Sequence, residues 1–278
     1  MLERPRREGD KCPISLIIEC MLGRYMHIKK YLQKLRDYFR YYQNCLYFRI
    51  HALLSDELVL YIHYPGLGDH LFYSHLPRLM KESGRYSKVY ISSFSEFRSN
   101  DTKKLVWELN PFVDGFVAKK SRSCTMNVKI GKKNLLAVIA YMYGLNIDYA
   151  DPEIFYEPKL IPALSDVTLY DPNYISNAGE ICVEDIKQYF QDQQIAISDQ
   201  LAPREKNMAL TDAKTLNTPN IFDFIDTLFS VKSVYCLTTG TATICSAIGK
   251  KAHVLYGKGI IPMHHHSKTN AYILLGDN

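Results

Sequence analysis

The chain has 278 residues, 47% hydrophobic and 23% charged, so it can build a globular core, and its composition excludes an intrinsically disordered protein. The net charge is +5, but residues 1–50 alone carry eleven Lys or Arg against five Asp or Glu, and the rest is nearly neutral. Because no basic patch continues into the body of the chain, we expect no nucleic-acid binding. No apolar run reaches the roughly 18 residues of a membrane-spanning helix. Seven scattered cysteines without a CxxC pair indicate a reducing, cytoplasmic setting.

The first predicted element is a long helix, or a kinked pair of helices, over residues 22–54. Apolar residues recur there at alternating spacings of three and four, which is the spacing of one helical face. They are Tyr25, Ile28, Leu32, Leu35, Phe39, Tyr42 and Leu46. The lysines and arginines of the segment fall off this stripe. The pattern is typical of a helix packed on its own protein or on a second copy, and it also fits a basic amphipathic helix lying on an anionic membrane surface.

Short β-rich runs alternate with amphipathic helices from Glu57 onwards, which is typical of an α/β fold with doubly wound parallel sheets. Strands are predicted over 57–63, 88–92, 112–118, 167–170, 195–197, 233–237 and 252–257. Helices are predicted over 70–83, 102–109, 132–143, 184–193, 219–229 and 239–249, with Thr218 capping the helix at 219–229. The chain has four predicted parts. A basic aromatic helical extension at 1–56 comes before the alternating pattern begins, and a proline-rich linker at 146–165 separates two α/β domains at 57–145 and 166–278.

The stretch YPGLGDH follows the first predicted strand, at the edge of the sheet where open α/β folds bind ligands. Gly66 and Gly68 would let the backbone turn tightly and approach a ligand closely. Asp69 is expected at the N-cap or in the first turn of the next helix, where it serves either as a cap or as the base that takes a proton from an acceptor hydroxyl. His70 is either a core-edge histidine or a contact to that acceptor.

A matching turn follows the strand at 233–237 and consists of Thr238, Thr239, Gly240 and Thr241. Its hydroxyls, its glycine and the N–H groups of the following helix suit a diphosphate, and a helix simply capped by threonine fits equally well.

Together, the two loops resemble glycosyltransferase family 9, which contains the bacterial lipopolysaccharide heptosyltransferases. The likeness covers roughly residues 57–257. It is carried by GLGDHLFYSHLPRLMKE, by Asn110-Pro111-Phe112-Val113-Asp114 and by TTGTATICSAIGKKAHVLYG. It implies a GT-B fold, in which two Rossmann-like domains face each other across a cleft. Residues 57–145 would form the acceptor side and residues 166–278 would bind the donor.

The resemblance further implies an inverting, metal-independent transferase without a cofactor. It would move a sugar from a nucleotide-activated donor to a hydroxyl of a glycan or lipid-linked acceptor, as in lipopolysaccharide or capsule synthesis, in the cytoplasm at the inner face of the membrane. Asp69 matches the family's base, and Thr238, Thr239 and Gly240 match the turn that holds the donor's diphosphate and sugar. Lys258, just after the last predicted strand, is a candidate to stabilise the leaving group, together with the helix N–H groups near Thr241.

The chain departs from the family at Thr238, where the family has Asp, and at Thr243, where it usually has His. The second domain also looks short for a full donor domain. Two other functions therefore stay open: a sugar-nucleotide epimerase and a catalytically degenerate protein that binds or assembles glycans. The run His264-His265-His266 is expected in a surface loop and not in a metal site.

Overall fold

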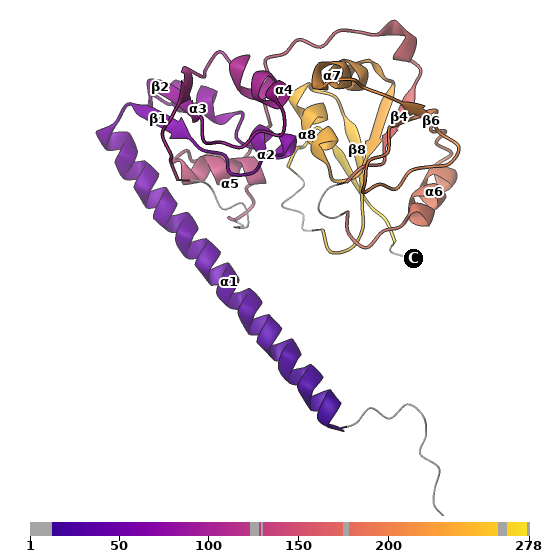
Figure 1. Cartoon of the computed structure of the whole chain (residues 1–278), viewed down its shortest axis with the longest axis horizontal. Helices are drawn as coiled ribbons and strands as arrows, with labels where there is room; N and C mark the ends of the chain where they lie inside the picture. The colour runs from indigo at the N-terminus through magenta and orange to yellow at the C-terminus, as the bar shows by residue number, and fades with distance from the viewer. Residues whose placement is uncertain (1–12, 123–127, 129, 175–177, 261–265, 277–278) are drawn as a thin grey trace, which may run out of the picture.

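The computed structural model describes residues 13–122, 128, 130–174, 178–260 and 266–276. They form two parallel sheets in neighbouring lobes, and helices α2 (Leu67–Leu71) and α8 (Gly240–Ala247) lie where the lobes meet (Figure 1). The α/β class with two parallel sheets is therefore confirmed.

The first sheet has three parallel strands in the order β1-β2-β3. They are β1 (Glu57–Leu60), β2 (Lys88–Ser92) and β3 (Gly115–Val117). Its helices are α2, α3 (Leu76–Glu82), α4 (Asn100–Lys103), which runs into a π-helical turn (Lys104–Glu108), and α5 (Leu135–Met142). The single helix predicted over 70–83 is wrong: α2 begins at Leu67, and a turn separates it from α3, where Pro77 lies in the first turn because its missing N–H is not needed there.

The second sheet has six parallel strands in the order β6-β5-β4-β7-β8-β9. They are β4 (Thr168–Asp171), β5 (Asp199–Leu201), β6 (Lys214–Leu216), β7 (Ser233–Cys236), β8 (Ala252–Tyr256) and β9 (Ala271–Leu274). With its strands counted along the chain, this order is 3-2-1-4-5-6, that of a complete dinucleotide-binding fold. The expectation of a short second domain is therefore wrong, and the first sheet is the smaller one.

Three helices connect the strands of the second sheet: α6 (Val183–Asp192), α7 (Ile221–Ser230) and α8. A short 3-10 turn (Pro162–Leu164) precedes β4. The predicted cap of α7 is wrong, because Asn220 caps the helix and its side chain accepts the N–H groups of Phe222 and Asp223.

One hydrophobic core runs through both lobes. It includes Leu58 and Ile91 from the first sheet and Leu169 and Val234 from the second, all at most 1% exposed. The two sheets are therefore parts of one packed body.

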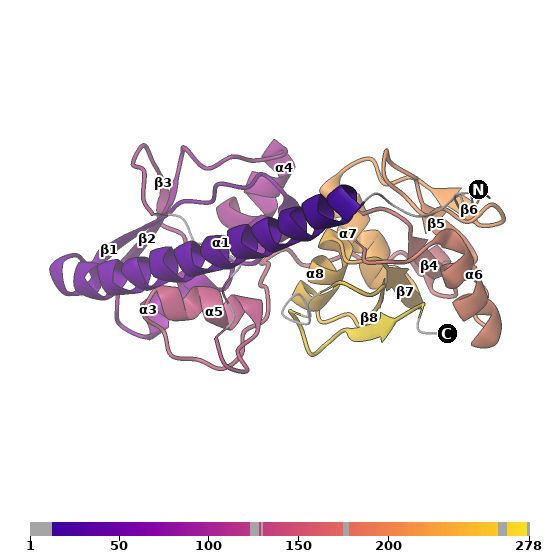
Figure 2. The ribbon, with the colours of Figure 1, turned by 90° about the horizontal axis from the view of Figure 1, so that it is seen from below.

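Helix α1 (Pro13–Leu54) projects from the first lobe, and only its C-terminal part packs on the body (Figures 1 and 2). There Tyr41, Cys45 and Phe48 are buried, and the Tyr41 hydroxyl donates to the carbonyl of Val138 in α5 at 2.7 Å. The predicted apolar stripe lies on another face, and its seven side chains are 48–65% exposed. The expectation that this stripe packs on its own chain is therefore wrong. Among the described residues, none of the helices has the length and apolarity needed to cross a bilayer.

Candidate functional site

Asp69 lies in the first turn of α2, three residues after the N-cap residue Gly66. A Cβ atom built on Gly66 would lie only 2.4 Å from Asp69 Oδ2, so the carboxylate folds back over a position where a side chain would collide with it. The backbone N–H of Gly66 favours the charged form of this carboxylate. The N-cap residue is Gly66, and Asp69 lies in the first turn, which is the second of the two positions that the sequence allowed.

Burial raises the pKa of the half-buried Asp69 carboxyl above its usual value, and the backbone hydrogen bonds at Gly66 and at its own amide oppose this rise only in part. A carboxylate with a raised pKa holds a proton more strongly, so Asp69 suits a general base better than an ordinary surface aspartate does.

His70 is fully buried next to Asp69. Trp107 Nε1 donates to His70 Nδ1 at 2.9 Å, which leaves the imidazole proton on Nε2, and Nε2 lies 2.8 Å from the carbonyl oxygen of Glu96. The ring also stacks on Phe97, with 4.7 Å between centroids. Burial lowers the pKa of His70 to about 4. Because both ring nitrogens bond inside the protein, His70 anchors the loop that carries Asp69 and does not face an acceptor.

The second loop starts after β7 and leads into α8, whose N-cap is Thr239. The Thr239 hydroxyl accepts the N–H of Thr241 at 3.2 Å, so the threonine cap that the sequence allowed is present. Thr238, Thr239 and Gly240 are half-buried, and Thr241 is buried.

Asp171, at the end of β4, lies behind this turn and is only 4% exposed. Its carboxylate accepts hydrogen bonds from the hydroxyls of Thr239 (3.4 Å) and Thr241, and from the backbone and side-chain nitrogens of Asn173 (3.1 and 2.8 Å). Asp171 was not among the residues predicted from the sequence. Its signal was its position, since it ends the first strand of a doubly wound sheet.

Strand order explains why Asp171 and the threonine turn meet. β4 and β7 are neighbours, and the connections leave the sheet in opposite directions from this point. Ligands of open α/β sheets bind in the crevice beyond the carboxyl ends of such a pair. The turn Thr238 to Thr241 therefore lies where this topology favours a ligand.

The two predicted loops are in direct contact. A Cβ atom on Gly68 would lie 3.8 Å from Gly240 Cα and 3.8 Å from the hydroxyl of Thr243, and a Cβ atom on Gly240 would lie 3.8 Å from the Gly68 nitrogen. Since 3.8 Å is an ordinary van der Waals distance, α2 and α8 lie side by side at these two positions (Figure 1). Residues more than 160 positions apart in the sequence are thus brought to one place.

Lys258 follows β8 at the same sheet edge, one strand beyond the threonine turn, and it is exposed. Its carbonyl accepts the backbone N–H of Glu180 at 2.8 Å, and the backbones of Gly257 and Glu180 pack too closely for a side chain at Gly257. These backbone contacts therefore fix Lys258 just beyond the carboxyl end of β8, with its side chain exposed.

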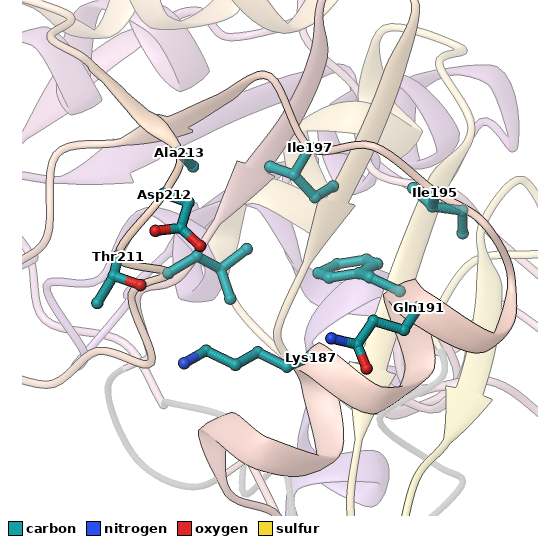
Figure 3. A pocket seen from close by; sticks show the side chains of 9 residues that line it. Lys187, Gln191, Ile195, Ile197, Thr211, Asp212 and Ala213 are labelled. Atoms are coloured by element: carbon teal, nitrogen blue, oxygen red, sulfur yellow. The ribbon is translucent and has the colours of Figure 1, made fainter.

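A separate pocket of about 370 Å³ opens beside α6 (Figure 3). It is lined by Lys187, Phe190, Gln191, Ile195, Ile197, Leu210, Thr211, Asp212 and Ala213. None of the predicted site residues lines it, so it is distinct from the contact between α2 and α8.

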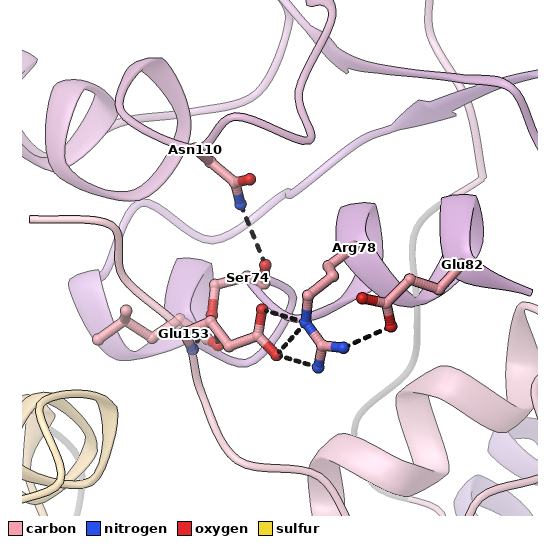
Figure 4. A network of polar contacts seen from close by, with 6 residues as sticks. Ser74, Arg78, Glu82, Asn110 and Glu153 are labelled. Carbon is pink, nitrogen blue, oxygen red and sulfur yellow. Dashed lines mark hydrogen bonds and ion pairs between the residues drawn. The ribbon is translucent and has the colours of Figure 1, made fainter.

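The linker is fixed to the first lobe by a polar network (Figure 4). Arg78 in α3 holds Glu153 through two nitrogens, with Nη2 to Oε1 at 2.6 Å and Nε to Oε1 at 3.1 Å, and it also reaches Glu82 at 2.5 Å. The Ser74 hydroxyl accepts the N–H of Glu153 at 2.7 Å, and Asn110 donates to the Ser74 carbonyl at 3.3 Å. The segment from Ser74 to Arg78 follows α2, so the network holds the linker close to the Asp69 loop.

No group of three or more His, Cys, Asp or Glu in the described part of the chain is arranged to hold a metal ion. His264 and His265 lie outside the described residues. His266 is buried, with its ring centroid 5.4 Å from that of Phe72, so the surface loop expected for the histidine run is wrong at this position. The described cysteines Cys45, Cys182, Cys236 and Cys245 are free thiols.

No model of a known protein family matches the sequence, and no curated protein matches it either. Solved structures do resemble the fold. A glycosyltransferase family 9 protein from Veillonella parvula aligns with a TM-score of 0.54 and 8% identity over 79% of this chain and 84% of that one.

A second similar protein is the heptosyltransferase TibC of enterotoxigenic E. coli, described as iron-containing and dodecameric. It aligns with a TM-score of 0.55 and 9% identity over 77% of this chain, which spans 61% of the TibC chain. A further TibC structure, in complex with ADP-D-beta-D-heptose, aligns with a TM-score of 0.54 and 9% identity over 78% of this chain and 62% of that one. The resemblance inferred from the two loops is thus confirmed for the fold: the chain has the fold of glycosyltransferase family 9 proteins.

Proposed function

We propose that the protein is an inverting glycosyltransferase that moves a sugar from a nucleoside-diphosphate donor to a hydroxyl of a bacterial surface glycan, such as lipopolysaccharide or capsule, or its lipid-linked precursor. One observation carries the proposal. The Gly68–Gly240 contact places α2, whose Asp69 is a half-buried carboxylate with a raised pKa, against the turn that follows β7 in a complete six-stranded sheet.

In the proposed mechanism Asp69 removes the proton of the acceptor hydroxyl, and the oxygen attacks the anomeric carbon of the donor. The bond to the nucleoside diphosphate breaks on the opposite side, which inverts the configuration. The N-terminus of α8 near Gly240 and the exposed Lys258 stabilise the negative charge on the leaving diphosphate.

Donor recognition differs from the family pattern in this proposal. Thr238 stands where the family has Asp, and the carboxylate of this region comes from Asp171 on the neighbouring strand. TibC binds ADP-D-beta-D-heptose, but because Asp171 points at threonine hydroxyls, we propose a different nucleotide sugar as donor. Such donors are made in the cytoplasm, which is where we place the reaction.

The proposal is tested first by thermal shift against ADP, UDP, GDP, CDP and their common sugars, and then by mass measurement of the product. We expect one nucleoside diphosphate to raise the melting temperature. Asp69→Asn should retain this shift and lower the rate of transfer at least a hundredfold. The exposed Asp166→Asn is the matched control and should leave the rate unchanged. Near-normal transfer by Asp69→Asn, or no shift with any nucleotide, would refute the proposal.

Metal independence is part of the proposal and has its own test, since the similar TibC is iron-containing. Transfer should be unchanged after dialysis against EDTA. A loss that is restored by a divalent metal would show that the metal-independent mechanism is wrong.

One observation favours a second candidate function, glycan binding without transfer. The hydroxyls of Thr239 and Thr241 are bonded to Asp171, so they are not directed at a diphosphate in this structure. A protein of this kind would be stabilised by the acceptor glycan and by no nucleoside diphosphate, so the same thermal-shift panel separates the two functions.

A further inference from the structure

The α1 stripe, defined as Tyr25, Ile28, Leu32, Leu35, Phe39, Tyr42 and Leu46, is a continuous apolar surface. Each of its side chains is 48–65% exposed, and together they follow one face of α1 over about six turns. Figure 1 shows that much of α1 extends away from the two lobes, and in Figure 2, seen from below, α1 runs across the view in front of them. Isolated exposed apolar residues are common on proteins, but a row of seven marks a surface that binds something.

The projecting part of α1 needs such a partner to be a stable helix. Residues 31–36 are all exposed, so within this segment no face of the helix packs on the body. Helices without tertiary contacts are marginally stable in water. A surface that covers the stripe would supply the missing contacts.

The charges on α1 indicate which surface this is. The exposed side chains of Lys29, Arg36 and Arg40 follow one edge of the stripe. Between Tyr25 and Ile50 the sequence has six Lys or Arg and a single acid, Asp37, which is 8% exposed and already accepts a hydrogen bond from Gln33 at 3.0 Å. A second copy of the helix would bring like charges together, whereas an anionic lipid surface complements them.

We propose that α1 lies flat on an anionic membrane surface. The leucines, Ile28 and Phe39 of the stripe enter the boundary between headgroups and acyl chains, and Tyr25 and Tyr42 sit at headgroup level. Lys29, Arg36 and Arg40 contact lipid phosphates. The helix thereby tethers the two-lobed body to the membrane.

The experiment is co-sedimentation of the full chain with vesicles of phosphatidylcholine alone or with 30% phosphatidylserine. We expect the wild type to bind the anionic vesicles at least tenfold more tightly, and less tightly in 0.5 M NaCl. The triple variant Leu32→Gln, Leu35→Gln, Phe39→Gln should lose at least tenfold in binding to the anionic vesicles. The triple variant Lys29→Glu, Arg36→Glu, Arg40→Glu should lose the preference for them.

The matched control is Lys214→Glu, Lys232→Glu, Lys251→Glu, which changes the net charge equally at exposed sites of the second lobe. It should bind anionic vesicles almost as the wild type does. Far-UV circular dichroism checks that each variant keeps its helix content. Equal loss in the control would show that net charge alone drives binding and would overturn the proposal.

The proposal is also overturned if the wild type binds neither vesicle. A second result would also overturn it. If light scattering finds a dimer for the wild type and a monomer for the triple glutamine variant, then a second copy of the chain covers the stripe. Neither result bears on transfer by Asp69, so the two proposals stand or fall separately.

Discussion

The buried His70 gives a sharp prediction about how stability depends on pH. Burial holds its pKa at about 4, against 6.5 for an ordinary histidine, and burial lowers the pKa of His75 to about 3. Between pH 6.5 and pH 4 the unfolded chain therefore binds protons that the folded chain does not. Stability is fully present above pH 6.5 and is lost as the pH falls towards 4 and below.

The size of the loss follows from these values. For His70 the full difference is about 3 kcal/mol, and about 2 kcal/mol of it has developed at pH 5. His75 adds about 2 kcal/mol at the same pH by the same relation. We therefore expect the free energy of unfolding to fall by about 4 kcal/mol between pH 7 and pH 5 from these two groups.

Urea unfolding at pH 7 and pH 5 measures this difference, and Trp107, the single tryptophan, is a fluorescent probe at the site. Its indole donates directly to His70 at 2.9 Å. The variant His70→Asn cannot titrate, so its loss on acidification should be about 2 kcal/mol smaller than that of the wild type. An unchanged loss in this variant would mean that His70 titrates normally, and the description of a neutral anchor would be wrong.

Three further variants probe the site and its surroundings. Gly66→Ala places a methyl group 2.4 Å from Asp69 Oδ2, so the carboxylate must move, and we expect transfer to slow at least tenfold; an unchanged rate would contradict this placement. Asp171→Ala leaves the buried donors of Asn173 and Thr241 without their acceptor. The free energy of unfolding in urea should fall by about 2 kcal/mol. A fall below about 0.5 kcal/mol would contradict the hydrogen bonds described at Asp171. Arg78→Lys removes the hydrogen bonds that two guanidinium nitrogens donate to Glu153. A double-mutant cycle of urea unfolding with Glu153→Gln should give a coupling free energy of about 1 kcal/mol. A coupling of zero would show that the ion pair does not contribute to stability.

Sequence patterns located most of the strands, because buried parallel strands are continuous apolar runs. The strand predicted over 195–197 is wrong: β5 lies at Asp199–Leu201, and its sequence DQL is not an apolar run. β1, β2 and β7 fall within predicted ranges. β6 and β9 were not predicted. They are the two edges of the second sheet and are short and partly exposed, so their pattern is weak.

The site was predicted only in part, for a physical reason. Gly66, Gly68 and Asp69 form a local signal within a few residues, and so do the threonines after β7. Asp171 acts on hydroxyls some 70 positions away, and that pairing exists only once β4 lies beside β7. The helix α1 shows the same limit, since periodicity revealed an apolar stripe but not that Tyr41, Cys45 and Phe48 form the face that packs.

The continuous core between the sheets also determines how the molecule unfolds. Because apolar side chains of both lobes share one interior, separating the lobes exposes that interior to water. Neither lobe is then an independent folding unit, and heating should give a single cooperative transition in a calorimeter. A chain cut within the linker at 146–165 should yield two fragments that are insoluble alone and recover the native fold only when they refold together.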